Sequence, residues 1–303
     1  MKIVVTGASG FIGTHLSRYL LDRNNEVVGL GRSAARNRIG HDGYRFVEAD
    51  TTRPGDWQQV LSGVDAVVNL AGRSIFGRWS EAVKSEIRES RILTTRHSVQ
   101  GLSSGAKTIF ISASGVGFYG SRGDDVLTEE ALAGRDFLAG LSVDWEGEAL
   151  AALKKGARVV LMRQGVVLGE GGGALAQMVP AFKRFVGGPI GNGRQWFPWI
   201  HIEDLVAAVQ FLLDTPGIRG PVNLCAPSPV RNRDLAAALG RVLNRPAVMP
   251  APAFMIRMVL GEFAEVLLGS QRAVPHKLLQ QHFSFRYPDI AGALQAVIHP
   301  EAV

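Results

Sequence analysis

The chain of 303 residues contains a single cysteine, Cys225. It has no apolar stretch near the roughly 18 residues needed to cross a bilayer. One cysteine cannot form an internal disulfide, so we expect a reducing compartment and a buried, unreactive thiol. The N-terminus begins directly with the strand-like run KIVVTG and has no charged-then-apolar signal pattern. This beginning favours a cytoplasmic protein without membrane contact.

Other patterns are absent as well. No cluster of His, Cys or carboxylate residues has metal-ligand spacing, and no Gly-x-Ser-x-Gly motif occurs. The formal charge of +6, from 33 basic and 27 acidic side chains, suits an anionic ligand. Because the arginines are scattered rather than gathered into a stripe with aromatic residues, nucleic-acid binding is not expected. We therefore expect a small-molecule partner.

Short β-branched runs alternate with helical periods through the first half of the chain. Nearly continuous apolar strands separated by helices predict an α/β fold, a Rossmann-type doubly wound parallel sheet covered on both faces. We assign residues 1–168 to the nucleotide-binding domain, with a return segment at about 198–226. Residues 169–303 are expected to form a smaller C-terminal substrate-binding lobe with a helical cap. In the tail from Pro250, Met and Phe recur at helical spacing, and we expect them in the core.

The segment VTGASGFIG, residues 5–13, follows a predicted strand and begins a helix. Its glycines allow a tight turn, close approach of the backbone to a pyrophosphate, and close packing of helix on sheet. The free amides at the helix start would then hold the phosphates. This context predicts a dinucleotide site that includes Gly7, Ser9, Gly10, Phe11, Ile12 and Gly13.

The end of the second predicted strand distinguishes NAD from NADP(H). An acid at this point usually binds the ribose 2′-hydroxyl of NAD, but this sequence reads GLGRSAARNR, with Arg32 there. A guanidinium pairs well with a phosphate, whereas an acid would repel it. We therefore predict NADP(H), with Arg32 on the 2′-phosphate and Arg38 in a solvated turn.

Two further strand ends fit the same cofactor. Asp50 ends FVEAD, where it is placed either to accept hydrogen bonds from the adenine amino group or to cap a helix. NLAG follows the next strand, and we expect the ribose and nicotinamide half of the cofactor to pass over Leu70, Ala71 and Gly72.

Together TGASGFIG, the Asp50 strand end, NLAG and ISAS resemble the extended short-chain dehydrogenase/reductase superfamily, which includes sugar-nucleotide epimerases and reductases. NLAG followed by GRWSEAVKSEIRESR, SASGVGFYG, DWE and WFPWIHIEDL resembles its atypical "epimerase family" branch. PHKLLQQHFSFRYPDIAGAL resembles the short C-terminal domain of unknown function found in that branch. The resemblance covers almost the whole chain. It implies a Rossmann fold, an NADP(H) site and a loop under the nicotinamide at RQGVVLG, with backbone contacts around Val166.

The helix expected in FLAGLSVDWEGEAL, residues 137–150, lacks the Tyr-x-x-x-Lys pair that relays protons in typical members of the superfamily. Counted back from Glu146, which resembles the glutamate after that motif, the two positions hold Leu138 and Ser142. None of the four tyrosines in the chain has a lysine four residues later. Another group must therefore stabilise or protonate the substrate oxygen.

Ser114 and Tyr119 are the candidates for that task. Ser114 matches the family's catalytic serine at the end of TIFISAS and either contacts substrate or nicotinamide or bonds to its own loop. Tyr119, in GVGFYG, either reaches the same cleft or is a packing residue. For His201 and Asp204, capping and core roles fit better than an acid-base pair. A further hypothesis is an aromatic and polar pocket made by Arg78, Trp79, Trp145, Gln195, Trp196 and Trp199.

Three functions fit these residues. We favour an NADP(H)-dependent oxidoreductase that acts on a small-molecule carbonyl or hydroxyl by a variant proton relay. A nucleotide-sugar epimerase needs a competent base and so suffers most from the missing Tyr and Lys. A non-catalytic NADPH-binding sensor or scaffold is the third alternative. The two long exposed helices expected beside the sheet leave a homodimer open.

Overall fold

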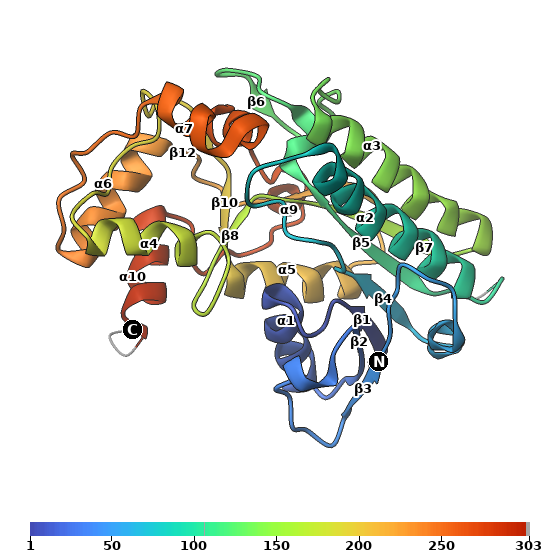
Figure 1. Cartoon of the computed structure of the whole chain (residues 1–303). Coiled ribbons are helices and arrows are strands. Elements are labelled where there is room, and N and C mark those ends of the chain that lie inside the picture. Colours follow the sequence, from blue (N-terminus) through green and yellow to red (C-terminus); the bar gives the residue numbers. More distant parts are fainter. Residues whose placement is uncertain (106, 301–303) are drawn as a thin grey trace.

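The structure is a computed structural model that describes residues 1–105 and 107–300. Its centre is a seven-stranded parallel sheet in the order β11-β7-β5-β4-β1-β2-β3 (Figure 1). The chain runs outward from β1 to β3 on one side and from β4 to β11 on the other, so the strand order reverses at β1. The predicted doubly wound, Rossmann-type sheet is confirmed. Its strands are β1 (Lys2–Thr6), β2 (Glu26–Gly31), β3 (Tyr44–Glu48), β4 (Ala66–Asn69), β5 (Ile109–Gly115), β7 (Arg158–Gln164) and β11 (Gly220–Leu224).

The strands are apolar on both sides because helices cover both faces of the sheet. In β1, Ile3 and Val5 belong to one buried cluster and Val4 to the other. Helices α1 (Phe11–Leu21) and α5 (Ile202–Asp214) pack together on one face of the sheet, and α2 (Glu81–Gly101) and α3 (Phe137–Leu150) lie side by side on the other (Figure 1). After β2 the chain makes only a short 3₁₀ turn, η1 (Ala34–Arg36).

Helices α2 and α3 begin at polar caps. The Ser80 side chain accepts a hydrogen bond from the Val83 amide, and Asp136 accepts one from the Ala139 amide at 2.9 Å. Such caps satisfy amides that the helix itself leaves free. The beginning of α3 at residue 137 agrees with the helix expected there.

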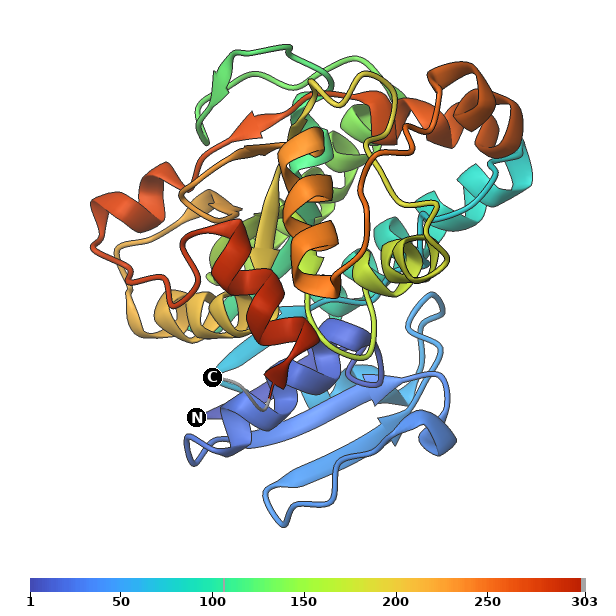
Figure 2. The same ribbon diagram turned by 90° about the vertical axis from the view of Figure 1, so that its left-hand side faces the viewer.

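After β7 the chain leaves the large sheet, returns to it at β11, and builds a second body that lies to the left of the sheet in Figure 1 and in front of it in Figure 2. Here α4 (Leu175–Lys183), α6 (Asn232–Leu243) and α10 (Ile290–Ile298) share a separate core that includes the buried Trp199. Three pairs of short strands join this body to the loops of the large sheet: β8 (Val166–Leu168) with β10 (Trp199–His201), β9 (Trp196–Phe197) with β12 (Val230–Arg231), and β6 (Val126–Leu127) with β13 (Arg272–Ala273). The remaining turns and helices are η2 (Asp56–Leu61), η3 (Val116–Tyr119), η4 (Ala151–Lys155), α7 (Ala253–Leu260), η5 (Gly261–Phe263), α8 (Ala264–Leu268) and α9 (His276–Gln280).

The tail from Pro250 departs from its prediction in one respect. It is helical, but α7 has no buried residue, and its Phe254 and Met258 are 65% and 68% exposed. The expectation that this Met and Phe stripe is core was wrong for α7, whereas Phe263, further along the tail, is buried and packs on Phe76 and Trp79. Within the described residues, no helix is both long and apolar enough to cross a membrane.

Candidate cofactor and active site

The glycine turn between β1 and α1 has the close packing that its sequence predicts. Gly7 has a φ of +69°, and a Cβ on it would lie 3.0 Å from the backbone of Ala71. A Cβ on Gly13 would lie 2.2 Å from the Gly7 carbonyl oxygen. Only glycine fits these two positions without a shift of backbone, and the turn therefore lies directly against the loop after β4.

The start of α1 is free to receive an anion. Its N-cap, Gly10, makes no side-chain cap, and its first turn contains no acid. Unpaired amides and the helix dipole favour a phosphate at such a terminus. The ring of Phe11 packs against Gly169, Gly172 and Gly173, so the loop after β8 covers this helix start.

Arg32 follows the last residue of β2 and is exposed. A Cβ on Gly31 would lie 2.9 Å from the Ser9 hydroxyl oxygen, so the glycine turn and the end of β2 meet here. The Glu48 carboxylate accepts a hydrogen bond from the Ala34 amide at 2.9 Å and holds the turn after Arg32. The exposed Arg32 thus follows directly after a residue that contacts the glycine turn.

Asp50 closes a turn at the end of the next strand. Its Oδ1 accepts hydrogen bonds from the Thr52 hydroxyl at 2.7 Å and the Thr52 amide at 3.1 Å. These hydrogen bonds lower the pKa of Asp50. The residue does not cap a helix, since η2 begins only at Asp56. Its contact with adenine stays a prediction.

A buried hydrogen-bond network holds NLAG where the strand order reverses. The Thr6 hydroxyl accepts hydrogen bonds from the amides of Leu70 and Ala71 at 3.0 and 3.1 Å and donates to Asn69 Oδ1 at 2.7 Å. Asn69 Nδ2 in turn donates to Thr95 Oγ1 of α2 at 2.8 Å. Thr6 and Thr95 were not identified from the sequence, because their partners come from distant parts of the chain.

Val166 begins β8, beyond the end of β7. Its amide donates to the Pro198 carbonyl at 2.8 Å, so this amide is not free for a cofactor. A Cβ on Gly165 would lie 3.1 Å from the Pro198 backbone. The groups at this loop that could contact a cofactor are therefore the half-buried Val166 side chain and the neighbouring carbonyls.

Ser114 lies near the carboxyl end of β5 and is 4% exposed. Its hydroxyl donates to Glu146 Oε1 of α3 at 2.7 Å, not to its own loop. The same carboxylate receives two hydrogen bonds from Arg163 of β7, from Nε at 2.9 Å and from Nη2 at 2.8 Å. The hydrogen of the Ser114 hydroxyl is therefore directed at Glu146 in this arrangement.

Tyr119 is fully buried. Its hydroxyl donates to Asn223 Oδ1 at 2.6 Å and accepts a hydrogen bond from Arg163 Nη1 at 3.2 Å. Burial raises the pKa of Tyr119 to about 12. The phenol thus lies in the core rather than on a cleft, which agrees with the packing alternative, and its part in proton transfer stays a prediction.

The two positions that Tyr and Lys occupy in typical relatives carry no substitute for them. Leu138 is half-buried, and its Cβ lies 3.2 Å from where a Cβ on Gly117 would be. Ser142 is 6% exposed. The ionisable groups of this region are instead Glu146 and Arg163, which pair with each other.

The tryptophans do not share one set of partners. Trp79 packs on Phe137 with ring centroids 5.1 Å apart, and buried Trp145 donates to Thr95 Oγ1 at 2.8 Å. Arg78 is exposed.

The other members of the predicted pocket belong to the second body. Trp196 donates to Asp124 at 2.8 Å, and Trp199 is 1% exposed. Gln195 Nε2 donates to the backbone carbonyls of Ile190 and Leu267. Trp196 and Gln195 therefore have hydrogen-bond partners, whereas the buried Trp199 Nε1 has none among the described residues. The hypothesis of one shared pocket gains no support.

His201 and Asp204 have the capping and core roles predicted for them. His201 Nδ1 accepts a hydrogen bond from the Glu203 amide at 3.2 Å. Asp204 accepts hydrogen bonds from the amides of Arg286 and Tyr287 at 2.7 and 3.0 Å. Burial lowers the pKa of His201 to about 4.

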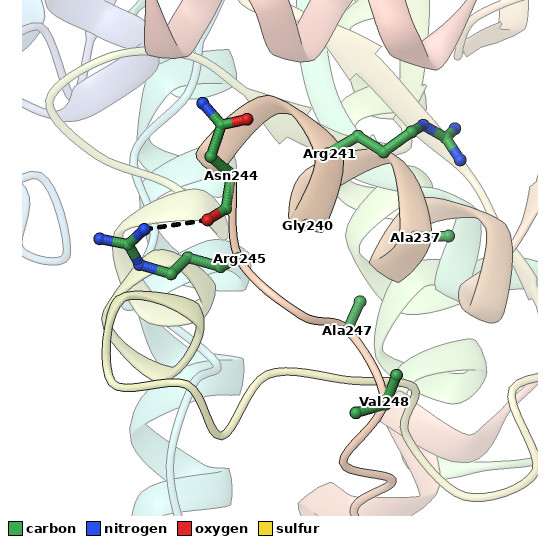
Figure 3. Close-up of a pocket in the computed structure, with 7 residues that line it drawn as sticks. All are labelled: Ala237, Gly240, Arg241, Asn244, Arg245, Ala247 and Val248. Atoms are coloured by element: carbon green, nitrogen blue, oxygen red, sulfur yellow. Dashed lines mark hydrogen bonds between the residues drawn. The ribbon is translucent and has the colours of Figure 1, made fainter.

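A separate hollow lies at the end of α6, outside the loops described above (Figure 3). Arg245 donates there to the Asn244 carbonyl at 2.9 Å. Its lining residues are Ala237, Gly240, Arg241, Asn244, Arg245, Ala247 and Val248. Within the described residues, no three His, Cys, Asp or Glu side chains are grouped so as to hold a metal ion.

Comparison with known proteins agrees with this geometry. Residues 3–225 match the model of the NAD dependent epimerase/dehydratase family, and residues 251–297 match a domain of unknown function. The chain is 40% identical over 302 residues to the "epimerase family protein SDR39U1 homolog, chloroplastic" of Arabidopsis thaliana, covering 98% of this chain and 87% of that protein. It is 38% identical to "epimerase family protein YfhF" of Bacillus subtilis, covering 98% of both chains.

A solved structure shows the same architecture. The crystal structure of human epimerase family protein SDR39U1 with NADPH superposes with a TM-score of 0.85 at 31% identity, covering 98% of this chain and 99% of that chain. The similarity therefore extends through the glycine turn, the large sheet and the second body.

Proposed function

Because the chain belongs to the NAD dependent epimerase/dehydratase family, we propose that it is an NADP(H)-dependent oxidoreductase acting on a small-molecule carbonyl or hydroxyl. The observation that carries the proposal is the corner where Arg32 and Ser9 meet the glycine turn. An arginine here pairs with a 2′-phosphate, whereas NAD sites usually place an acid at this point.

The residues present fit the cofactor. The free amides at the start of α1 suit the pyrophosphate, and the glycines of the turn carry no side chain that would keep it from the backbone. NADPH, when bound, supplies a hydride from its nicotinamide ring. Phe11 and the loop after β8 would cover the phosphates, while Leu70, Ala71, Gly72 and Val166 would line the path toward the nicotinamide.

For the reacting end we keep Ser114 and Tyr119 as the proposed pair, with unequal roles. Ser114 acts on a substrate oxygen only when its hydroxyl turns away from Glu146, which now receives its hydrogen. Tyr119 is linked to that carboxylate through Arg163, so it would act as a positioning residue. Substitution of both residues without loss of turnover would remove this pair from the mechanism.

Leu138 and Ser142 favour a second candidate, a non-catalytic NADPH-binding sensor or scaffold. Neither side chain moves a proton as Tyr and Lys do. The same absence weighs more heavily against a nucleotide-sugar epimerase, because oxidation of a hydroxyl needs a base. We therefore rank reduction of a carbonyl first.

Two properties of the protein are part of the proposal. The buried, unpaired thiol of Cys225 supports a reducing compartment such as the cytoplasm. Val143 and Leu150 of α3 are 46% and 39% exposed, which supports pairing of two copies along this helix. Light scattering on the purified protein would distinguish a dimer from a monomer.

The experiment that tests the function uses NADPH deuterated at nicotinamide C4 on the face that is transferred. The protein is incubated with this cofactor and a cytosolic metabolite extract, and mass spectrometry searches for deuterium in a metabolite. A labelled product would establish a reductase and identify its substrate. NADPH that binds but stays unchanged across varied extracts would favour the sensor.

A further inference from the structure

Arg91 of α2 is a part-buried cation without a carboxylate partner in the part of the chain that the structure describes. Its Nη1 donates to the Ile87 carbonyl at 2.9 Å, and its guanidinium lies 5.3 Å from the centroid of the Trp145 ring. The guanidinium carries five N–H donors, and among the described residues only this one hydrogen bond uses them. Burial alone lowers the pKa of Arg91 to about 10, because no acid opposes its effect.

Arg91 lies beside Gly72, on the proposed path toward the nicotinamide. Four residues further along the same helix, Thr95 accepts hydrogen bonds from Asn69 at the end of β4 and from Trp145 of α3. Arg91 is one turn nearer the helix start, beyond the end of the strand. A Cβ on Gly72 would lie 3.2 Å from the Arg91 Cζ, and Gly72 itself is open to solvent.

The charged residues near Arg91 on α2 form ion pairs with other residues. On the same helix, Arg88 pairs with Asp144 at 2.6 Å and Arg96 with Glu148. Glu86 pairs with Arg73 of the loop after β4. A guanidinium withdrawn from water is stabilised by an anion that can replace its hydration, and a carboxylate matches its planar donors in bidentate fashion.

We propose that Arg91 is a substrate-binding residue that receives a carboxylate group beside the nicotinamide, so that the substrate is a small carboxylate-bearing carbonyl or hydroxy compound. This inference rests on the proposed function. The phosphates of NADPH are assigned to Arg32 and the start of α1, which leaves Arg91 for the other ligand. A neutral carbonyl would not offset its charge.

The test uses oxalate, a planar carboxylate, as the probe and inorganic phosphate as the comparison anion. The thermal midpoint of the NADP⁺-loaded protein is followed against each anion at constant ionic strength. The variants are Arg91→Gln, Arg91→Lys and the matched control Arg88→Gln, whose exposed arginine pairs with Asp144. The affinity of each for NADPH is measured separately by fluorescence.

We expect oxalate to stabilise the wild type and Arg88→Gln in a saturable way. The apparent affinity for oxalate should fall by at least about tenfold in Arg91→Gln and should be intermediate in Arg91→Lys. The affinity for NADPH should stay within about threefold in all of the variants, since no group of the cofactor is assigned to Arg88 or Arg91.

The proposal would be overturned by oxalate without effect on the wild type, by an equal effect on Arg91→Gln, or by a stronger response to phosphate than to oxalate. A large loss of NADPH affinity in Arg91→Gln would make this residue a cofactor ligand instead. Failure of the proposed function looks different: the wild type would bind no NADPH, or would bind it without transferring deuterium to any metabolite, whatever its response to oxalate. If Arg91→Gln does not fold, Arg91→Lys serves as the test. A weakened affinity for oxalate with an unchanged affinity for NADPH would support the proposal, and equal changes in the two affinities would overturn it.

Discussion

Arg163 and Glu146 form a bidentate ion pair inside the fold, with side chains 5% and 7% exposed. The Arg163 guanidinium lies 3.4 Å from the centroid of the Phe118 ring, which covers it. Ser114 donates to the same carboxylate. Because these residues come from β7, α3 and β5, the pair fixes the relative positions of the three elements beneath the proposed reacting end.

Loss of one member of this pair should be costly. We expect Glu146→Leu to lower the free energy of unfolding by about 3–5 kcal/mol, because Arg163 would remain buried without a counter-charge. The double variant Glu146→Leu with Arg163→Met removes both charges and should cost clearly less than the sum of the two single changes. Urea unfolding of the four proteins measures this coupling. Strictly additive losses would show that the pair contributes no coupling to stability.

The choice of cofactor depends on Arg32. Arg32→Ala should weaken NADPH binding by at least about tenfold and leave NADH binding nearly unchanged, because only NADPH carries the 2′-phosphate. Arg38→Ala is the matched control in the same loop and should have little effect. Fluorescence titration at constant ionic strength compares the dissociation constants. An unchanged NADPH affinity in Arg32→Ala would refute the assignment.

The close packing of the glycine turn gives a pair of opposite predictions. A Cβ on Gly13 would meet backbone atoms of Gly7 and Ala8 at 2.2 and 2.7 Å. Gly13→Ala should therefore destabilise the protein by about 1–3 kcal/mol and weaken NADPH binding by displacing the turn.

Gly147, in the exposed face of α3, is the control, because a Cβ there meets nothing within 4 Å. Gly147→Ala should raise the free energy of unfolding by about 0.5–1 kcal/mol through helix propensity. Chemical denaturation measures both changes. If the two variants had equal stability, packing at Gly13 would not explain why glycine is there.

The sequence predicts best what depends on local pattern. The glycine turn, Arg32 and the beginning of α3 at Phe137 were all readable, because each follows from a few neighbouring residues. The parallel sheet followed from its apolar strands, which must be covered on both faces. The exposed stripe of α7 was not predictable, since helical periodicity shows that residues share a face but not whether anything packs against it.

The reacting end was harder to predict because its contacts are distant in the chain. Ser114 was correctly placed at the end of β5, yet its partner Glu146 lies 32 residues away. For Tyr119 the sequence left the cleft and a packing role open, and only the fold shows that Asn223, 104 residues further along, holds its hydroxyl in the core. Arg91 was not identified from the sequence, because only the fold shows that it has no acidic partner among the described residues.

Stability should depend on pH through His201. Burial lowers the pKa of this imidazole to about 4, against about 6.5 in an unfolded chain. The unfolded state therefore binds more protons between these values, so stability is fully present above pH 6.5 and is lost as the pH falls toward 4. The loss from this one group should reach about 3 kcal/mol.

His201→Asn isolates that contribution, because asparagine keeps a side-chain oxygen to accept from the Glu203 amide but does not titrate. The raised pKa of Asp204 and the lowered pKa of His15 are present in both proteins, so their effects cancel in the difference. Urea unfolding at a series of pH values from 7 to 4 should show the wild type losing more stability than His201→Asn, with the gap opening below pH 6.5. Parallel curves over this range would mean that His201 takes up its proton as readily in the folded protein as in the unfolded chain, and the buried, neutral imidazole would have to be abandoned.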